Sequence, residues 1–240
     1  MFPLKDDNPT RGTPVVTIAL IAVNVIVFLY QLSLPPGSAE RFIFQYGSIP
    51  AVVTGLGRLS DDLAAVPPLA SVLTSMFLHG GWMHLVGNMW FLWIFGNNIE
   101  EATGRFRFVL FYLACGLAAG AAHILANPSS AIPAIGASGA IGGVLGAYIM
   151  IYPRARVHTL IFLFVFIRVL YLPAAVILGY WFVLQLLGGS TTAGEAGGVA
   201  FWAHVGGFVA GVVLVGVFKK RSVRFFNPPH GAPLMRAMGD

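Results

Sequence analysis

The stretch GASGAIGGVLGAYIMIY, residues 136–152, places the small hydroxyl of Ser138 at the head of a long apolar run. The chain contains no Lys, Arg, Asp or Glu between Arg107 and Arg154. A serine between two glycines is ordinary in a soluble loop, but this one begins an uncharged segment of the kind that spans a bilayer. A polar side chain in such a segment indicates either close helix packing or a functional site.

The composition is that of a membrane protein with several spans. Of the 240 residues, 57% are hydrophobic and only 10% are charged, whereas about a quarter of a soluble globular chain is charged. The net charge of +5 does not indicate a nucleic-acid partner, because the basic residues lie between the apolar blocks rather than along one amphipathic face. The single cysteine, Cys115, excludes an intrachain disulfide and is expected to pack as a small apolar side chain.

Six apolar segments are long enough to cross a bilayer, the second and fourth of them only inside a bundle. They are residues 14–32, 82–95, 106–125, 138–152, 169–187 and 199–218. The sequence therefore predicts an all-α membrane protein with six transmembrane helices in residues 14–218. A cytoplasmic segment, 1–13, precedes this bundle, and a basic, disordered cytoplasmic tail, 219–240, follows it. The apolar stretch 157–167 fits either an interfacial helix or an extension of the fifth span.

The basic residues set the orientation of these spans. Six spans bring the N-terminus, the second and fourth connections and the C-terminus to one side, which then holds every Lys and Arg except Arg41 and Arg58. The positive-inside rule places that side, with both termini, in the cytoplasm of a multi-pass cell-membrane protein. On the outer side, the long connection 33–81 is expected to be folded and partly embedded, and the glycine-rich connection 188–198 to be mobile.

This topology brings three polar side chains to a similar depth, a little below the outer surface. Ser138 begins the fourth span, His204 lies near the start of the sixth, and His84 lies near the start of the second, and all three spans run inward. Asn88 follows His84 by four residues and therefore shares its helix face. Ionisable and polar residues at such positions are functional candidates by default.

Glycine stripes allow the helices of Ser138 and His204 to approach each other closely. Glycines follow Ser138 at i+4 and i+8 and follow His204 at i+3 and i+7, which are the positions Gly142, Gly146, Gly207 and Gly211. Small residues let membrane helices pack backbone to backbone, so the imidazole is expected to reach the hydroxyl. A neutral imidazole is the usual base that activates a serine near neutral pH.

The expected chemistry is acyl transfer by a Ser–His dyad, because every Asp and Glu lies outside the predicted spans. His84, Asn88 and the backbone N–H of Ser138 are candidate donors to the oxyanion. Gly136, which has no side chain, is expected to leave the backbone beside Ser138 accessible. Three other polar residues are interpreted as interfacial or structural: His79, Asn24 and His123.

Competing interpretations lack their characteristic residues. The nucleophile elbow of α/β-hydrolases needs glycine two positions after the serine, where Ala140 stands. HLVGN (84–88) does not match the H-E-x-x-H of zinc proteases, and no aspartate lies in a span. The three histidines His79, His84 and His204 have no neighbouring carboxylate, so no metal or cofactor is expected. Serine and glycine in membrane helices ordinarily serve only helix packing. The shared depth of Ser138, His204 and His84 favours a functional site instead.

With these motifs the sequence resembles the rhomboid family of intramembrane serine proteases. HLVGN (84–88) is similar to the family's H-x-x-x-N in the second span, GASGA (136–140) to its G-x-S-G at the fourth, and AHVGGF (203–208) to its A-H-x-x-G in the sixth. FGNNIEEATGRFRF (95–108) resembles the family's acidic segment followed by glycine. The resemblance covers residues 14–218 and implies a rhomboid-like bundle of the simplest bacterial, six-span form.

The resemblance also implies roles for residues. Ser138 would be the nucleophile, His204 the general base, and His84 and Asn88 would complete the oxyanion hole next to Gly136. The substrates would be transmembrane segments of single-span or polytopic membrane proteins, taken from the lipid bilayer and cleaved near its outer side. A gate near the fifth span and residues 188–198 would admit them.

Two departures from the family pattern stand out. Family members often carry an aromatic residue one turn after the serine, where it stacks on the histidine, and this sequence has Gly142 there. The Trp-Arg pair that many members carry in the long first connection is absent. The alternative function is a non-catalytic rhomboid-like scaffold that binds client transmembrane helices, although such relatives lack the serine or the histidine. A small-solute transporter is disfavoured, because the sequence shows no paired inverted halves.

Overall fold

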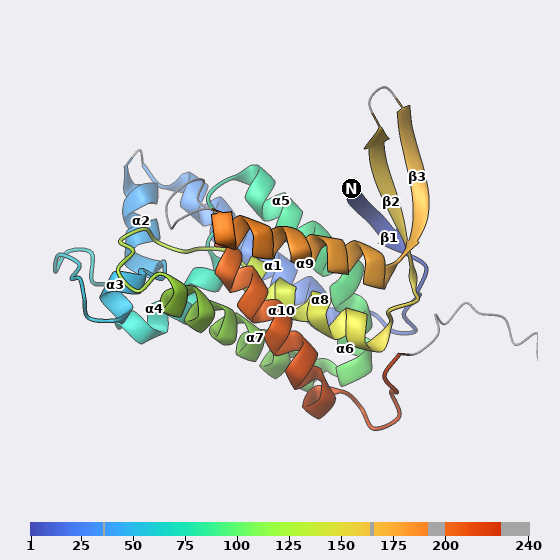
Figure 1. Cartoon of the computed structure of the whole chain (residues 1–240). Coiled ribbons are helices and arrows are strands. Elements are labelled where there is room, and N and C mark those ends of the chain that lie inside the picture. The colour runs from blue at the N-terminus through green and yellow to red at the C-terminus, as the bar shows by residue number, and fades with distance from the viewer. Residues whose placement is uncertain (36, 164–165, 192–199, 227–240) are drawn as a thin grey trace, which may run out of the picture.

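The computed structural model describes the chain except residues 36, 164–165, 192–199 and 227–240. Figure 1 shows the long helices side by side in one bundle, with three strands projecting from one end. In chain order the elements are β1 (Phe2–Asp6), α1 (Val15–Ser33), α2 (Ser38–Tyr46), α3 (Pro50–Val53), α4 (Pro68–Thr74), η1 (Ser75–Phe77), α5 (Trp82–Phe91), η2 (Leu92–Gly96), α6 (Asn97–Thr103), α7 (Arg105–Ala126), α8 (Ser138–Ile151), β2 (Arg156–Leu163), β3 (Phe166–Pro173), α9 (Ala174–Thr191) and α10 (Phe201–Phe218).

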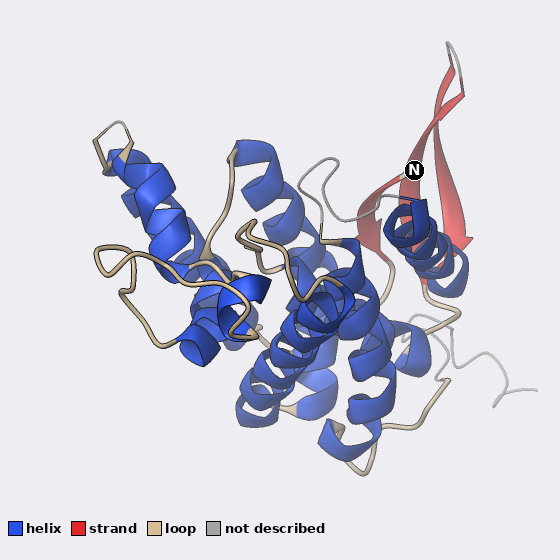
Figure 2. Ribbon diagram, turned by 60° about the vertical axis from the view of Figure 1, so that its left-hand side comes forward, coloured by secondary structure: helices blue, strands red, loops and turns tan. Residues whose placement is uncertain are grey.

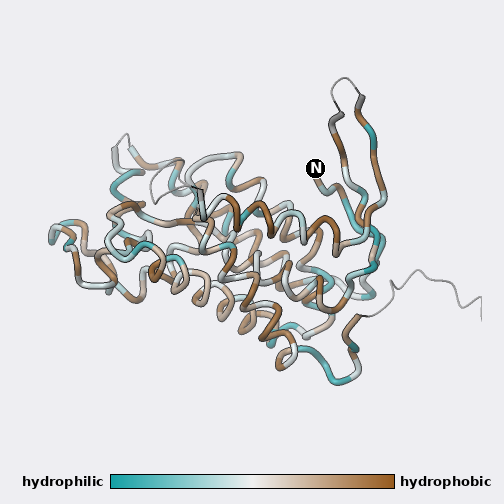
Figure 3. Tube along the Cα trace, viewed as in Figure 1, coloured by the Kyte–Doolittle hydropathy of each residue, from teal (hydrophilic) through white to brown (hydrophobic). Residues whose placement is uncertain are grey.

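The helical membrane bundle predicted from the sequence is confirmed. Among the described residues, three helices, α1, α7 and α10, are long and apolar enough to cross a membrane. The bent pair 68–77 and 82–103, with 81° between its arms, is a fourth candidate, and α8 and α9 are shorter apolar helices. Figure 3 shows hydrophobic residues along the helices and much of the hydrophilic chain at the two ends of the bundle. Each predicted span corresponds to a helix, and a count of six crossing helices stays a prediction.

The glycine stripes bring α8 and α10 into backbone contact. A Cβ added at Gly207 would overlap the carbonyl oxygen of Gly139, and one at Gly211 would overlap that of Gly143. A Cβ at Gly146 would overlap the carbonyl oxygen of Phe208 in the same way. Because lipid is as apolar as the protein interior, close van der Waals packing of this kind holds membrane helices together. It also sets the short separation between the first turns of the two helices.

A buried carboxylate holds the start of α1 at the end of the bundle where Arg105, Arg154 and Lys220 lie, called here the basic end. Glu100 is 4% exposed. It accepts hydrogen bonds from the backbone N–H groups of Val16 and Thr17 and from the Thr17 hydroxyl, at 3.0, 2.8 and 2.8 Å. A carboxylate there satisfies N–H groups that have no partner within the helix and interacts favourably with the helix dipole.

The chain after α10 stays at the basic end. The Lys220 N–H donates to the Ala102 carbonyl oxygen at 2.8 Å, and the Phe226 N–H donates to that of Met150 at 3.0 Å. Residues 219–226 of the predicted tail therefore contact α6 and α8. The remainder of that tail, 227–240, lies outside the described residues.

A three-stranded antiparallel sheet, in the order β1–β2–β3, also lies at the basic end (Figures 1 and 2). β1 pairs Phe2 with Leu160, and it is attached to α5 where the Trp90 indole N–H donates to the Pro3 carbonyl oxygen at 2.7 Å. The bundle thus carries a sheet that the all-helical prediction did not include.

The sheet corrects the interpretation of residues 157–167. The described residues of this stretch are neither an interfacial helix nor an extension of the fifth span, because 157–163 lie in β2, 166–167 lie in β3, the two strands pair antiparallel, and α9 begins at Ala174 rather than near 169. The physical reason is a run of β-branched residues whose side chains alternate into the protein. Val157, Thr159 and Ile161 are all buried, and such residues fit a half-buried strand better than a helix surface.

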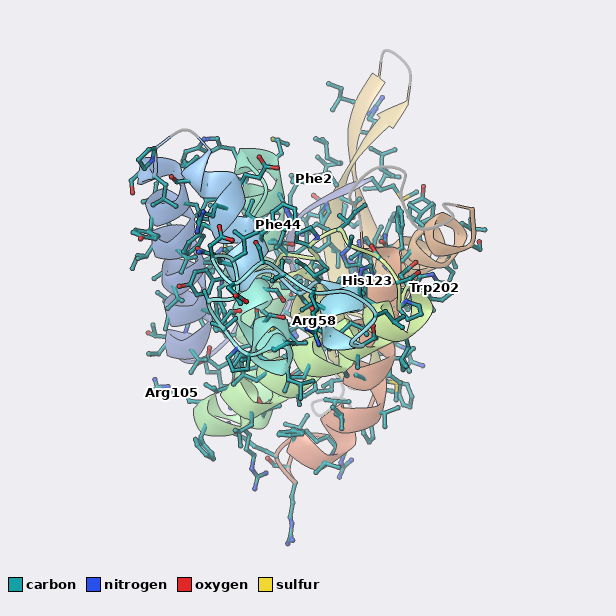
Figure 4. All side chains as sticks on the ribbon, turned by 90° about the vertical axis from the view of Figure 1, so that its left-hand side faces the viewer. Phe2, Phe44, Arg58, Arg105, His123 and Trp202 are labelled. Atoms are coloured by element: carbon teal, nitrogen blue, oxygen red, sulfur yellow. The ribbon has the colours of Figure 1, made fainter. Side chains whose placement is uncertain are left out.

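The connection 33–81 is folded, as the sequence predicts, and its partial embedding in the membrane stays a prediction. It contains α2, α3, α4 and η1, and an ion pair of 2.9 Å joins Arg41 to Asp62 on its surface. Ser48 and Ala134 exchange backbone hydrogen bonds of 3.1 and 2.8 Å, which tie this connection to the chain before α8. Figure 4 looks onto this end, called here the long-loop end, with Phe44 and Arg58 in front of the helices. Of the predicted mobile connection, residues 188–191 finish α9, and 192–198 lie outside the described residues.

Candidate active site

Ser138 and His204 lie in hydrogen-bond contact towards the long-loop end of the bundle. Ser138 is the first residue of α8, and His204 is in the first turn of α10. The Oγ atom of Ser138 is 2.7 Å from Nε2 of His204. This is the contact through which an imidazole takes the proton of an attacking hydroxyl.

The far side of the His204 ring contacts two side chains of α9. The His204 Nδ1 atom is 2.7 Å from Oε1 of Gln185. The ring of Trp181, one turn earlier on the same helix, has its centroid 5.7 Å from that of His204, with 35° between the planes. The imidazole is therefore held between α8 and α9 as well as by its own helix.

Gly136 brings the backbone before Ser138 close to His84 and Asn88. A Cβ added to Gly136 would lie 2.6 Å from Nε2 of His84 and 3.6 Å from Nδ2 of Asn88. Gly136 has φ +122°, a region that favours glycine, and its N–H donates to the Ser75 carbonyl oxygen at 2.9 Å. The turn therefore needs glycine for its conformation and for the space that His84 occupies.

His84 presents a ring N–H to this turn. The Gly80 backbone N–H donates to Nδ1 of His84 at 3.4 Å. Because Nδ1 accepts, the proton of the neutral ring sits on Nε2, the atom that faces Gly136.

His79 is buried within the protein and contacts Asn88, and its position at the membrane interface stays a prediction. It is 1% exposed, and its Nε2 is 3.0 Å from Nδ2 of Asn88. An amide nitrogen only donates, so His79 accepts, and the second amide hydrogen of Asn88 remains for another acceptor. The side chain of Gln31 in α1 makes two hydrogen bonds with the His79 backbone. Its Oε1 accepts from the His79 N–H at 3.1 Å, and its Nε2 donates to the His79 carbonyl oxygen at 3.2 Å.

A cavity of about 450 Å³ lies between α5 on one side and α8, α9 and α10 on the other. Its lining is mostly apolar and includes the polar side chains of His84, Asn88, Ser138 and His204. The N–H of Ser138 belongs to the first turn of α8, so it has no acceptor within the helix. The cavity is thus lined by a hydroxyl, an imidazole in contact with it and several N–H donors, which is a set of groups that acyl transfer could use.

Sequence reasoning missed Gln185 and the role of His79. Gln185 is a polar residue inside the fifth predicted span, which runs outward, so its position near the outer end of that span could have placed it at the same predicted depth as His204. His79 had no such signal, because its contacts with Gln31 and Asn88 depend on the bend before α5. Across residues 1–35, 37–163, 166–191 and 200–226, no group of three His, Cys, Asp or Glu side chains is arranged to hold a metal ion.

Fold and site together define a helical membrane protein with a serine–histidine pair beside a partly open cavity. The Rhomboid domain model matches residues 68–221. The chain is 30% identical over 219 residues to rhomboid protease GluP of Bacillus subtilis (strain 168), an alignment that covers 88% of this chain and 38% of that protein. It is 31% identical over 203 residues to the mitochondrial Rhomboid protein 1 of Saccharomyces cerevisiae, covering 81% of this chain and 51% of that protein.

A mouse protein, the mitochondrial presenilin-associated rhomboid-like protein, is 31% identical over 132 residues, which is 54% of this chain and 35% of that protein. The chain belongs to the rhomboid family. It spans between about a third and a half of the length of these relatives.

Proposed function

We propose that this protein is an intramembrane serine endopeptidase in which Ser138 is the nucleophile and His204 the general base. The observation that carries the proposal is the 2.7 Å contact between Ser138 Oγ and His204 Nε2 at the wall of the cavity. A relative that covers most of this chain, GluP of Bacillus subtilis, is named a rhomboid protease. Both residues that a non-catalytic scaffold would not need are present and in contact.

The first chemical step is attack on the scissile carbonyl carbon. Ser138 Oγ forms the new C–O bond while its proton passes to His204 Nε2, and the carbonyl oxygen becomes negatively charged. The donors for that oxygen are the Ser138 N–H, the His84 Nε2–H and the free amide hydrogen of Asn88. His204 then returns the proton to the leaving nitrogen as the C–N bond breaks, and a water molecule releases the acyl group from Ser138 by the same exchange.

The proposed substrates are transmembrane segments of single-span or polytopic membrane proteins. The mostly apolar cavity between α5 and α9 suits an apolar segment that arrives from the bilayer. Because Lys and Arg gather at the basic end, we place that end and both termini on the cytoplasmic side of a bacterial cell membrane. Ser138 then lies towards the outer side, so cleavage is expected near the outer end of the substrate segment.

The test uses the full chain in detergent or lipid with a phosphonate probe and a panel of single-span proteins. The wild type should be labelled and should cleave at least one panel member, and sequencing the cut ends locates the bond. Ser138→Ala should show no labelling and should lose cleavage to background, on the order of 10⁶-fold for a serine protease. Ser33→Ala, the same change at the end of α1, is the matched control and should keep both activities.

Undiminished cleavage by Ser138→Ala would overturn the proposal. Client binding by the wild type and Ser138→Ala alike, with no cleavage of any panel member, would support the scaffold function instead.

A further inference from the structure

The backbone of α10 lies beside Gly142, the position at which related sequences often carry an aromatic residue that stacks on the histidine. A Cβ added to Gly142, one turn after Ser138, would lie 3.0 Å from the His204 carbonyl oxygen and 3.4 Å from the Phe208 backbone nitrogen. α10 therefore lies directly beside Gly142, and a side chain there would require its neighbours to shift by at least a few tenths of an ångström. The orientation of the His204 ring has to be set from another element.

The structure assigns that role to α9: we propose that Gln185 is a positioning residue that fixes the proton of His204 on Nδ1 and leaves Nε2 free to accept from Ser138. The inference rests on the proposed function for its catalytic consequence. Gln185 is 9% exposed, and its Oε1 is 2.7 Å from Nδ1 of His204.

The orientation of the Gln185 amide is itself determined. Its Nε2 donates to the carbonyl oxygen of Trp181 at 3.3 Å, one turn back along α9. With the nitrogen directed along its own helix, the oxygen faces His204. An amide oxygen only accepts, so Nδ1 of His204 must carry the proton, and Nε2 presents its lone pair to the serine hydroxyl.

A glutamine suits this place because it accepts a hydrogen bond without introducing a charge. The helices that surround His204, α5 and α7 to α10, contain no Asp or Glu, and a carboxylate inside a membrane bundle is expensive to bury. Within the described residues, the titratable side chains that interact electrostatically with His204 are His84 on α5 and His123 on α7. When His204 takes the serine proton, the Gln185 oxygen is the polar group positioned to stabilise the positive ring.

Trp181 supports the same orientation from one turn away. Residues at i and i+4 share a helix face, so α9 directs an amide and an indole at one imidazole. The indole limits the tilt of the ring, and the amide fixes its rotation and its tautomer.

The experiment compares Gln185→Leu and Gln185→Glu with the wild type in the full chain. Gln185→Leu removes the acceptor and keeps an apolar side chain of similar size. It should lower kcat by about 10- to 100-fold, the loss expected for a hydrogen bond to a group that becomes charged, with little change in KM. Gln185→Glu restores an acceptor, so kcat should recover, and the acid limb of its pH–rate profile should move to higher pH because a carboxylate favours the protonated imidazole.

Two further measurements separate positioning from a purely structural role. Nitrogen NMR of ¹⁵N-histidine-labelled protein should show the His204 Nδ1–H tautomer in the wild type and a mixture of tautomers in Gln185→Leu. Gln45→Leu in α2, the same change where the amide only donates to the Asp62 carbonyl oxygen at 3.3 Å, is the matched control and should behave as wild type. If Gln185→Leu fails to fold, Gln185→Met replaces it.

A Gln185→Leu variant with the wild-type kcat, or a wild type without the Nδ1–H tautomer, would overturn the inference. Equal losses in the leucine and glutamate variants with unchanged pH profiles would also overturn it. A wild type that cleaves nothing but shows the tautomer change in Gln185→Leu would refute the proposed function and leave the positioning of His204 standing.

Discussion

Replacing Gly136 by alanine should damage the proposed oxyanion hole through His84. The added Cβ would lie 2.6 Å from Nε2 and 2.8 Å from Cε1 of His84, whereas carbon and ring atoms in contact are separated by about 3.5 Å or more. The ring therefore has to retreat by about 1 Å. The φ of +122° adds backbone strain on the order of 1–3 kcal/mol for a residue other than glycine.

The catalytic loss follows from the reach of a hydrogen bond. Donors to an oxyanion act at about 2.7–3.1 Å, and removing one costs about 10²–10³-fold in kcat. A retreat of about 1 Å takes His84 beyond that range. We expect kcat of Gly136→Ala to fall by about 100-fold or more, with KM within a few-fold of the wild type and an unfolding free energy lower by about 1–3 kcal/mol.

The assay measures kcat and KM on a cleaved transmembrane substrate, the rate of phosphonate labelling, and thermal unfolding. Gly179→Ala on α9 is the matched control, because a Cβ there meets no atom within 4 Å. A double-mutant cycle with His84→Ala shows the route of the effect. If Gly136→Ala acts by displacing His84, the double variant should be no slower than His84→Ala alone. Fully additive losses, or wild-type kcat in Gly136→Ala, would refute this reasoning.

Two predictions concern the bundle and the sheet. Gly211→Ala should destabilise the protein by about 1–3 kcal/mol and lower activity, because its Cβ would overlap the carbonyl oxygen of Gly143 and part α8 from α10. Thermal unfolding checks this against Gly216→Ala, whose Cβ would lie 3.6 Å from its nearest neighbour, and equal unfolding temperatures would contradict it. Burial raises the pKa of the Asp6 carboxyl in β1 from 3.8 to about 6, partly offset by the Tyr148 hydroxyl that donates to it. The folded chain then holds a proton that the unfolded chain releases, so this stabilisation of β1 is complete below about pH 4 and falls by up to about 3 kcal/mol as the pH rises through 6. Hydrogen-exchange protection of the β1 amides should be higher at pH 5 than at pH 7.5 and independent of pH in Asp6→Asn; equal protection in the wild type at both values would contradict the prediction.

The helical bundle and the depth of its polar residues follow from the sequence because both depend on local signals. An apolar run of the length of a bilayer predicts a helix wherever it occurs. Since successive spans alternate in direction, counting along each one predicts which residues share a depth. This reasoning predicts that Ser138, His204 and His84 lie near one another. The glycines that follow Ser138 and His204 predict that α8 and α10 pack closely.

The sheet was decided by the tertiary structure. β1 pairs with β2, more than 150 residues away along the chain, and neither segment shows in its own sequence which strand it pairs with. The stretch 157–167 is apolar at consecutive positions, so its pattern does not separate a buried strand from a short helix.

The rotation of each helix about its own axis was also decided by the tertiary structure. A membrane helix is apolar on its lipid-facing side and on its packed side, so hydropathy does not show which face of α9 meets α10. The packing of Trp181 against His204 and Phe208 of α10 fixes which face of α9 meets α10, and with it the contact between Gln185 and His204. The sequence by itself predicted that a serine and a histidine lie at one depth in the membrane. Only the tertiary structure shows that Gln185 contacts this histidine, because the contact depends on how α9 packs against α10.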